Sequence, residues 1–273
     1  MERKNQLQRL DNLFSLYEKS REVKLNFTEP FIVKIRQQSY SQFCEGLNKS
    51  YDDIYLNVME KVAAKMIKNR SIGGCNLGYI THNEINLIYK GTDPKDYRIL
   101  LSSFTTTHLT SWISSMVTNY FNEALFEEIK ENKLEDSIYS SKLFKAEFKV
   151  DAFSIPKECI YDYLWWKCWA CIRNSTTAIA IKEFTNEERI GKSAIELEEI
   201  LLNTKGIDVQ KDLPHRERYG ELCYKYRENG KLTTGYIVLD RPLSESNTKE
   251  PSKNKRNILK LLDRHYVEDI NSK

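Results

Sequence analysis

Hydrophobic residues recur along the chain with two periods, and these periods predict an alternation of strands and helices. The run 31–35 is apolar and largely β-branched apart from Lys34, which predicts a buried strand. Helical spacing of apolar residues predicts helices over 51–66 and 107–129. The segment 144–150 alternates strictly between apolar and polar residues, which is typical of a strand with one exposed face.

A polar tetrad, Thr81 to Glu84, separates two short apolar runs between 73 and 91. This arrangement predicts a hairpin or a sharply bent strand pair. An acid at the tip of such a turn, at the edge of a sheet, suits metal or phosphate chemistry. A plain surface hairpin with a polar tip is the alternative.

The remaining patterns predict a lead-in helix over 5–20, a long helix from Pro156 to about 181, a helix over 186–203, a hairpin pairing 219–226 with 235–239, a polar linker over 244–256 and a terminal helix over 257–270. The order strand–helix–strand–strand–helix–strand predicts an α+β fold: a ferredoxin-like antiparallel sheet with helices on one face. We expect a sheet domain over 1–183, a helix-and-hairpin subdomain packed on it over 184–243, and a linker with a terminal helix over 244–273.

Composition is that of an ordinary globular protein, with 40% hydrophobic and 30% charged residues among 273. A net charge of +3 gives little support for a polyanionic partner unless basic residues cluster in space. The sequence has no run of about 18 apolar residues and its first segment is charged throughout, so we expect neither a membrane span nor a secretion signal. Six cysteines lie scattered, and Cys168 and Cys171 stand in a helical pattern without a second pair. We therefore expect reduced core thiols and a cytoplasmic protein.

Several short segments carry a resemblance to a known family. They are WKCWACIRNS at 166–175, GKS at 191–193, 205–207, Leu213-Pro214 with Arg216 and Arg218, and Phe121-Asn122. In this order, from about Leu10 to Leu239, the chain resembles the tRNA-histidine guanylyltransferase family. That family includes guanylyltransferase-like proteins that add nucleotides to RNA 5′ ends in the 3′→5′ direction. Its own versions of the first two segments are W-R-Q-x-D-A-x-R-N-S and H-G-K-S.

The resemblance implies a polymerase-like palm over 1–183 and phosphoryl transfer through two magnesium ions. Hard cations take oxygen ligands, and the family supplies carboxylates from R-x-D-G-R-x-F after the first strand and from S-D-E at the hairpin. Here the two motifs become KIRQQSY at 34–40 and HNE at 82–84. Arg36 and Asn83 therefore stand at the two Asp positions, Gln37 stands at the Gly position, and Glu84 is the acid that remains.

An exchange of Asp for Arg changes the local charge by about two units and turns a cation site into one that repels cations. We therefore expect that two-metal catalysis is lost and that phosphate binds directly to Arg36, since a guanidinium pairs with phosphate bidentately. A loop merely solvated by Arg36 and Asn83 is the alternative. The resemblance implies nucleotide or phosphate binding by Arg36, Gln37, Gln38, Ser39, Tyr40, His82, Arg173, Asn174, Ser175, Lys192 and Ser193.

Other motif positions depart from the family in the same direction. Ala170 replaces the acid of the first segment, Lys167 its arginine, and Ile190 the histidine of the second. Arg173 lies one helical turn beyond Trp169, so it could clamp a nucleotide beside the indole, with plain core packing of the tryptophan as the alternative. Lys192 is either close to a phosphate or a solvated helix lysine.

Two functions are consistent with these residues. The first is a pseudoenzyme that binds a nucleoside triphosphate or an RNA 5′ end as a sensor, sequestering agent or regulatory subunit. The second is an active magnesium-dependent nucleotidyltransferase that extends tRNA 5′ ends, in which Glu84 and an acid from Glu45, Asp52 or Asp53 rebuild one metal site. Magnesium is expected only in the second case. The resemblance and the exposed aromatics of helix 107–129 lead us to expect a homo-oligomer, either a dimer or a tetramer.

Overall fold

A computed structural model of the chain describes residues 2–19, 25–26, 28–47, 52–69, 75–91, 106–229, 231–238 and 258. In chain order the elements are α1 (Glu2–Lys19), β1 (Phe31–Gln37), α2 (Tyr40–Phe43), α3 (Asp53–Lys68), β2 (Cys75–Ile80), β3 (Glu84–Tyr89), α4 (Thr106–Glu131), η2 (Ser140–Lys142), β4 (Phe148–Ser154), η3 (Lys157–Cys159), α5 (Ile160–Glu183), α6 (Asn186–Arg189), α7 (Ala194–Ile200), η4 (Leu201–Lys205), α8 (Val209–Asp212), α9 (His215–Tyr219), β5 (Glu221–Glu228) and β6 (Lys231–Val238).

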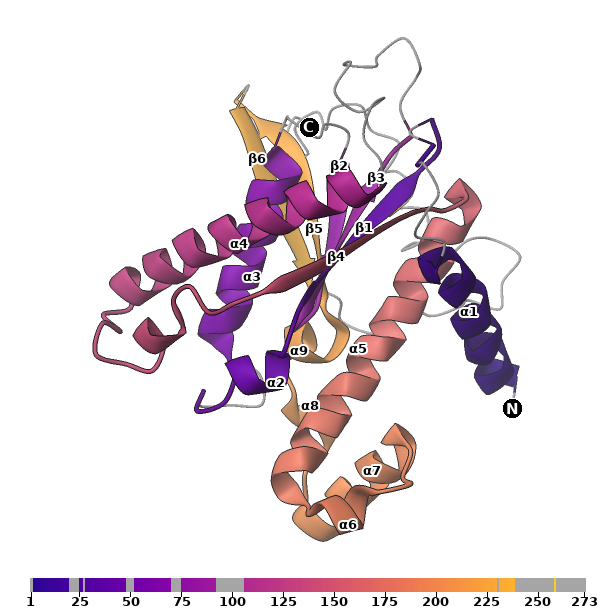
Figure 1. Cartoon of the computed structure of the whole chain (residues 1–273). Helices are drawn as coiled ribbons and strands as arrows, with labels where there is room; N and C mark the ends of the chain where they lie inside the picture. The colour runs from indigo at the N-terminus through magenta and orange to yellow at the C-terminus, as the bar shows by residue number, and fades with distance from the viewer. Residues whose placement is uncertain are drawn as a thin grey trace.

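Six strands form one antiparallel sheet in the order β4-β1-β3-β2-β5-β6 (Figure 1). The first four strands, with α3 and α4 as crossovers, have the predicted ferredoxin-like arrangement. The hairpin β5–β6 then extends the sheet through pairing of β5 with β2. The predicted α+β class is therefore confirmed.

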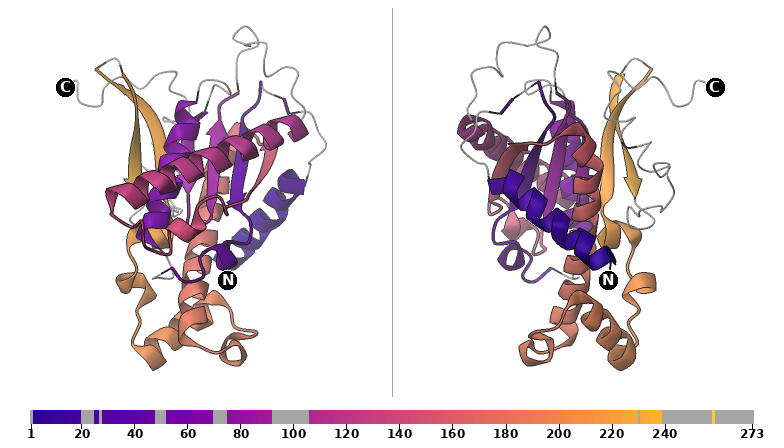
Figure 2. Two further views of the ribbon diagram at one scale, coloured as in Figure 1. Left: turned by 60° about the vertical axis from the view of Figure 1, so that its left-hand side comes forward. Right: turned by 90° about the vertical axis from the view of Figure 1, so that its right-hand side faces the viewer.

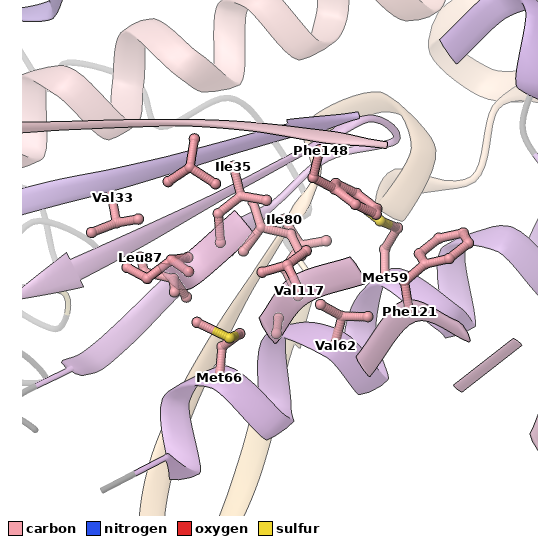
Figure 3. Close-up of a cluster of buried hydrophobic side chains, with 14 of the residues drawn as sticks. Val33, Ile35, Met59, Val62, Met66, Ile80, Leu87, Val117, Phe121 and Phe148 are labelled. Carbon is pink, nitrogen blue, oxygen red and sulfur yellow. The ribbon is translucent and has the colours of Figure 1, made fainter. Parts of the chain in front are cut away.

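Helices cover both faces of this sheet, which corrects the prediction of helices on one face only. The strand side chains Val33 and Ile35 pack with α3 and α4, as Figure 3 shows for Met59 and Phe121. Ile32, between them in sequence, packs on the opposite face with α1 and α5. Figure 2 shows α4 and α5 on opposite sides of the strands. The reason was visible in the sequence, because a strand that is apolar at nearly every position has both faces buried.

Helices predicted over 5–20, 51–66, 107–129 and from Pro156 to 181 are confirmed as α1, α3, α4 and α5, with ends that shift by a few residues. The strand predicted over 144–150 is displaced and runs from Phe148 to Ser154. Phe144 has φ 61° and is exposed, and its N–H donates to the Asn122 side chain at 2.7 Å. This left-handed conformation cannot continue a strand, so the alternation there was misleading.

The helix predicted over 186–203 is broken into α6 and α7, and α7 is followed directly by η4. Thr185 and Ser193 each cap a helix through a capping box, α6 and α7 respectively. Gly191 lies between them with φ 76°, a conformation that favours glycine. These caps outweigh the apolar spacing that suggested one continuous helix.

The segment 184–213 packs on the end of α5 through a small core of its own. That core consists of Leu56, Ala180, Phe184, Leu197, Leu201, Val209 and Leu213. It includes residues from both sides of the predicted boundary at 183/184, and the division into domains stays a prediction. The predicted linker 244–256 lies outside the described residues, as does the terminal helix 257–270 except for Ile258, which is buried and belongs to the same hydrophobic core as Ile32.

Within the described residues, no helix combines the length and the apolar character needed to cross a membrane.

Candidate functional site

The strand pairing brings the two departures from the metal motifs together. Arg36, near the end of β1, lies directly opposite Glu84, the first residue of β3. The Gln37 N–H donates to the Asn83 carbonyl at 3.1 Å, and the Thr81 N–H donates to the Glu84 carbonyl at 2.9 Å, which closes the hairpin turn. Segments that are about 45 residues apart in the sequence therefore form one corner of the sheet, as antiparallel pairing of β1 with β3 requires.

Glu84 projects toward α5, where its carboxylate is already engaged. The Lys167 ammonium lies 3.1 Å from Glu84 Oε1, and Asn86 Nδ2 donates to the same oxygen at 2.8 Å. The Tyr163 hydroxyl donates to Asn86 Oδ1 at 2.7 Å and so fixes the orientation of that amide. Burial alone would raise the pKa of Glu84, but the ammonium groups of Lys167 and Lys34 outweigh it and hold the pKa below its ordinary value.

Lys167 is held in place from several sides. Its ammonium lies 4.4 Å from the ring centre of Trp166 and 5.5 Å from that of Tyr163. The Trp166 indole N–H in turn donates to Asp11 of α1. The ion pair with Glu84 and the contacts with the aromatic rings offset part of the cost of burying the Lys167 ammonium.

A second ion pair follows on the same face of the sheet. The Lys34 ammonium lies 3.9 Å from Asp151 Oδ2, and both side chains are largely buried. Lys34 and Asp151 are register partners of β1 and β4, so partners in this register meet on the face toward α5. Neither residue was singled out from the sequence, although a lysine inside the apolar run 31–35 was a usable signal.

These residues do not fit a pair of magnesium ions. Among the described residues, no three His, Cys, Asp or Glu side chains are grouped so that they could hold a metal ion. Glu84, the acid at this corner among the described residues, is paired with Lys167, and Arg36 stands opposite it. Oxygen ligands with uncompensated charge are what magnesium requires, and here the charge is already neutralised from within the protein.

Asp52, one of the acids proposed to rebuild a metal site, makes its hydrogen bonds elsewhere in the structure. It caps α3, accepting from the Tyr55 N–H at 3.0 Å and from the Tyr139 hydroxyl at 2.6 Å. Tyr55 and Tyr139 belong to the core that α3 and α4 share with the sheet, on the face away from Glu84. Glu45 and Asp53 are exposed. The structure therefore does not bring Asp52 to Glu84.

The residues expected to bind phosphate beside Arg36 differ in burial, and only some of them are exposed. Gln37 is buried and accepts a hydrogen bond from the Tyr55 hydroxyl. The rings of His82 and Tyr40 lie 5.6 Å apart, and burial lowers the pKa of His82 to about 4. His82 is therefore neutral at pH 7. Gln38 is exposed, as is Ser39, which precedes α2 in a left-handed conformation.

The residues of α5 and of the loop before α7 that match the family motifs also differ in their exposure to solvent. Arg173 and Asn174 are exposed, whereas Ser175 is fully buried and its hydroxyl donates to the Ile172 carbonyl at 2.8 Å. Ser193 is the N-cap residue of α7, so its hydroxyl has a structural role that requires no ligand. The exposed Lys192 donates to the Glu188 carbonyl. Of these, Arg173 and Lys192 keep charged side chains in contact with solvent.

Comparison with known proteins gives the following matches. A family model described as tRNAHis guanylyltransferase matches residues 12–148. The fold is similar to a bacterial tRNA(His) guanylyltransferase-like protein in complex with ATP, with TM-score 0.71 and 19% identity over 93% of this chain and 100% of the other. The GTP complex of a bacterial protein of the same description gives TM-score 0.63, with the same identity and coverage. The tRNA(His) guanylyltransferase of Saccharomyces cerevisiae gives 0.60 and 17% identity over 84% of this chain and 95% of that one. No curated protein sequence matches the chain significantly.

Proposed function

Because the chain belongs to the tRNAHis guanylyltransferase family, we propose that it binds a nucleoside triphosphate where Arg36 and Glu84 meet and that it has lost two-magnesium nucleotidyl transfer. The nucleotide as ligand class is supported by the two bacterial structures of the same fold, which are complexes with ATP and with GTP. The loss of catalysis is supported by the charges at this corner of the sheet.

The ion pair between Glu84 and Lys167 is the observation that carries the proposal. A magnesium ion at Glu84 would have to compete with an ammonium 3.1 Å away while facing Arg36 across the ladder. At an effective dielectric constant of 20, each repulsion between unit charges 4 Å apart costs about 4 kcal/mol, and a divalent ion doubles it. Two such cations therefore outweigh what one remaining carboxylate can contribute to metal binding.

Without the metals, cationic side chains must neutralise the phosphates. Arg36 takes this role at the corner, and Arg173 and Lys192 are the exposed cations at the matched positions of α5 and the α6–α7 loop. Arginine can stabilise phosphate charge, but it does not activate an attacking hydroxyl or hold a leaving pyrophosphate by itself. The expected outcome is binding without turnover, in a protein that senses or sequesters a nucleotide or an RNA 5′ end.

The test combines binding with a search for turnover. Calorimetric titration with ATP and GTP should show binding, and radiolabelled tRNA with a 5′-monophosphate or 5′-triphosphate should not be extended in magnesium. Should extension occur, and should Glu84→Ala abolish it, the chain is an active 3′-5′ nucleotidyltransferase and the proposal is wrong. If neither nucleotide binds, the proposal also fails.

A further inference from the structure

Two cations face each other across the ladder between β1 and β4. Arg36 and Lys149 are register partners, and both are half-buried. Arg36 lies two residues after Lys34 on β1 and Lys149 two residues before Asp151 on β4, so this pair lies on the same face toward α5. The 3.9 Å ion pair of Lys34 with Asp151 shows that side chains in this register meet. Lys149 carries no motif and was not singled out from the sequence.

Like charges directly opposite each other in an antiparallel pair destabilise the sheet, unless an anion lies between them. Within the described part of the chain, neither the Arg36 nor the Lys149 side chain makes an ion pair or a hydrogen bond. The nearby carboxylates of Glu84 and Asp151 are paired with Lys167 and Lys34. The next acid along β4 is Glu147, which is exposed and precedes the strand.

Among the described residues around this ladder, four cations, Lys34, Arg36, Lys149 and Lys167, therefore accompany two sheet carboxylates, Glu84 and Asp151. Both of these carboxylates are already paired, with Lys167 and Lys34. The surplus positive charge is concentrated on Arg36 and Lys149, whose Cβ atoms lie roughly 5 Å apart in such a pair. A guanidinium can hold two oxygens of one phosphate in its plane, while an ammonium attracts a second phosphate as a point charge. A chain of linked phosphates offers oxygens at both places at once.

We propose that Arg36 and Lys149 together bind the triphosphate group of the ligand, as a protein-supplied replacement for metal ions. The proposal rests on the proposed function for the kind of ligand, but the cation pair would bind a triphosphate whatever is attached to it. Both nucleoside triphosphates and RNA 5′-triphosphates carry this group, and the experiment separates them.

The experiment measures binding of inorganic triphosphate, ATP and a short 5′-triphosphorylated RNA by calorimetry in EDTA. The variants are Arg36→Gln, Lys149→Gln and the double variant. The matched control is Lys145→Gln, because Lys145 is an exposed lysine just before β4. Each single substitution should weaken the binding of inorganic triphosphate by roughly tenfold, as expected for loss of one charge-assisted contact. The control should bind like the parent.

A second measurement separates a binding role from a structural one. Without ligand, Lys149→Gln should melt at the same temperature as the parent or higher, since it removes a like-charge contact. With triphosphate present, the parent should gain more thermal stability than the variant.

The outcomes distinguish the two proposals. Tight ATP binding that Arg36→Gln weakens and Lys149→Gln does not would overturn the cation pair and leave the proposed function standing. Tight ATP binding that neither variant weakens would contradict both proposals, because both place the phosphates at Arg36. Triphosphate binding that both variants lose, with ATP bound no more tightly than inorganic triphosphate, would support the pair and contradict the nucleotide site. Tighter binding of the RNA than of ATP would assign the site to an RNA 5′ end. No binding of any of the three would overturn both proposals.

Discussion

The two faces of the sheet at the end of β1 differ in what fills them. The face toward α3 and α4 is a closed apolar core, at whose edge Asp52 caps a helix and accepts from a tyrosine. The face toward α5 begins as an apolar core at Ile32 and becomes charged at Lys34 and Arg36. The first face thus maintains the fold, and the charged end of the second is where we propose that the ligand binds.

The largest expected effect comes from the apolar face. Phe121 is fully buried among Phe43, Tyr55 and Phe148, so Phe121→Ala should lower the free energy of unfolding by about 3–5 kcal/mol. Phe126 lies on the same helix with 48% of its surface exposed, so Phe126→Ala should change stability by less than about 0.5 kcal/mol. Urea unfolding measures both. Equal losses would show that α4 does not pack as described.

The next largest effect is expected from disrupting the ion pair on the charged face. Lys167→Met leaves Glu84 without its ion-pair partner and should cost about 3 kcal/mol at pH 7, reduced somewhat because Asn86 still donates to the carboxylate. Adding Glu84→Gln should recover much of this loss, because no uncompensated charge then remains. If the double variant is no more stable than the single one, the pair is not what holds Lys167 and Glu84 in place.

The same variant has a predictable pH dependence. In the parent the pKa of Glu84 is depressed, so its contribution to stability is present above the ordinary pKa near 4.5 and is lost as the pH falls through the folded-state value. Without Lys167, burial is opposed mainly by Lys34 and the Asn86 hydrogen bond, and the pKa of Glu84 should rise. The stability difference between parent and Lys167→Met should therefore shrink as the pH is lowered from 7 to 4.

A smaller effect tests whether Asp52 is structural. Asp52→Ala removes a helix cap and the acceptor of the Tyr139 hydroxyl, and should cost about 1–2 kcal/mol in thermal or urea unfolding. Nucleotide affinity should stay unchanged. Asp53 is exposed at the next position, and Asp53→Ala serves as the control for charge near the start of α3. Loss of nucleotide binding in Asp52→Ala alone would favour a ligand role for this acid.

The smallest predicted effect concerns the cations matched on α5 and before α7. Arg173→Ala and Lys192→Ala should each weaken ATP binding by about tenfold, which corresponds to about 1.4 kcal/mol. Neither substitution should lower the melting temperature, since both side chains are exposed. Lys182, which is exposed farther along α5, offers the matched control. ATP titrations that do not differ between either variant and the parent would place the nucleotide away from these positions.

Sequence patterns identified the sheet and its order because strand and helix periods were clear over 31–35, 51–66 and 107–129. They misplaced the start of β4. Residues 144–147 alternate between apolar and polar side chains as a strand would, but Phe144 has a left-handed backbone conformation that a strand does not adopt. Arg36, Asn83 and Glu84 were found by their motif positions. Lys149 was not, because only the register of β4 against β1 places it opposite Arg36. The pairing of strands that are more than 100 residues apart in the sequence is determined by tertiary structure, so no local sequence pattern predicts it.

The central claim is that side chains of this protein, and not metal ions, neutralise the phosphates of its ligand. The most direct measurement is the affinity for ATP and GTP by titration calorimetry in EDTA and again in excess magnesium. The account predicts binding in EDTA that magnesium does not strengthen, because Lys167 already neutralises Glu84 and Arg36 stands at the lost acid position. Binding that appears only when magnesium is added would contradict it.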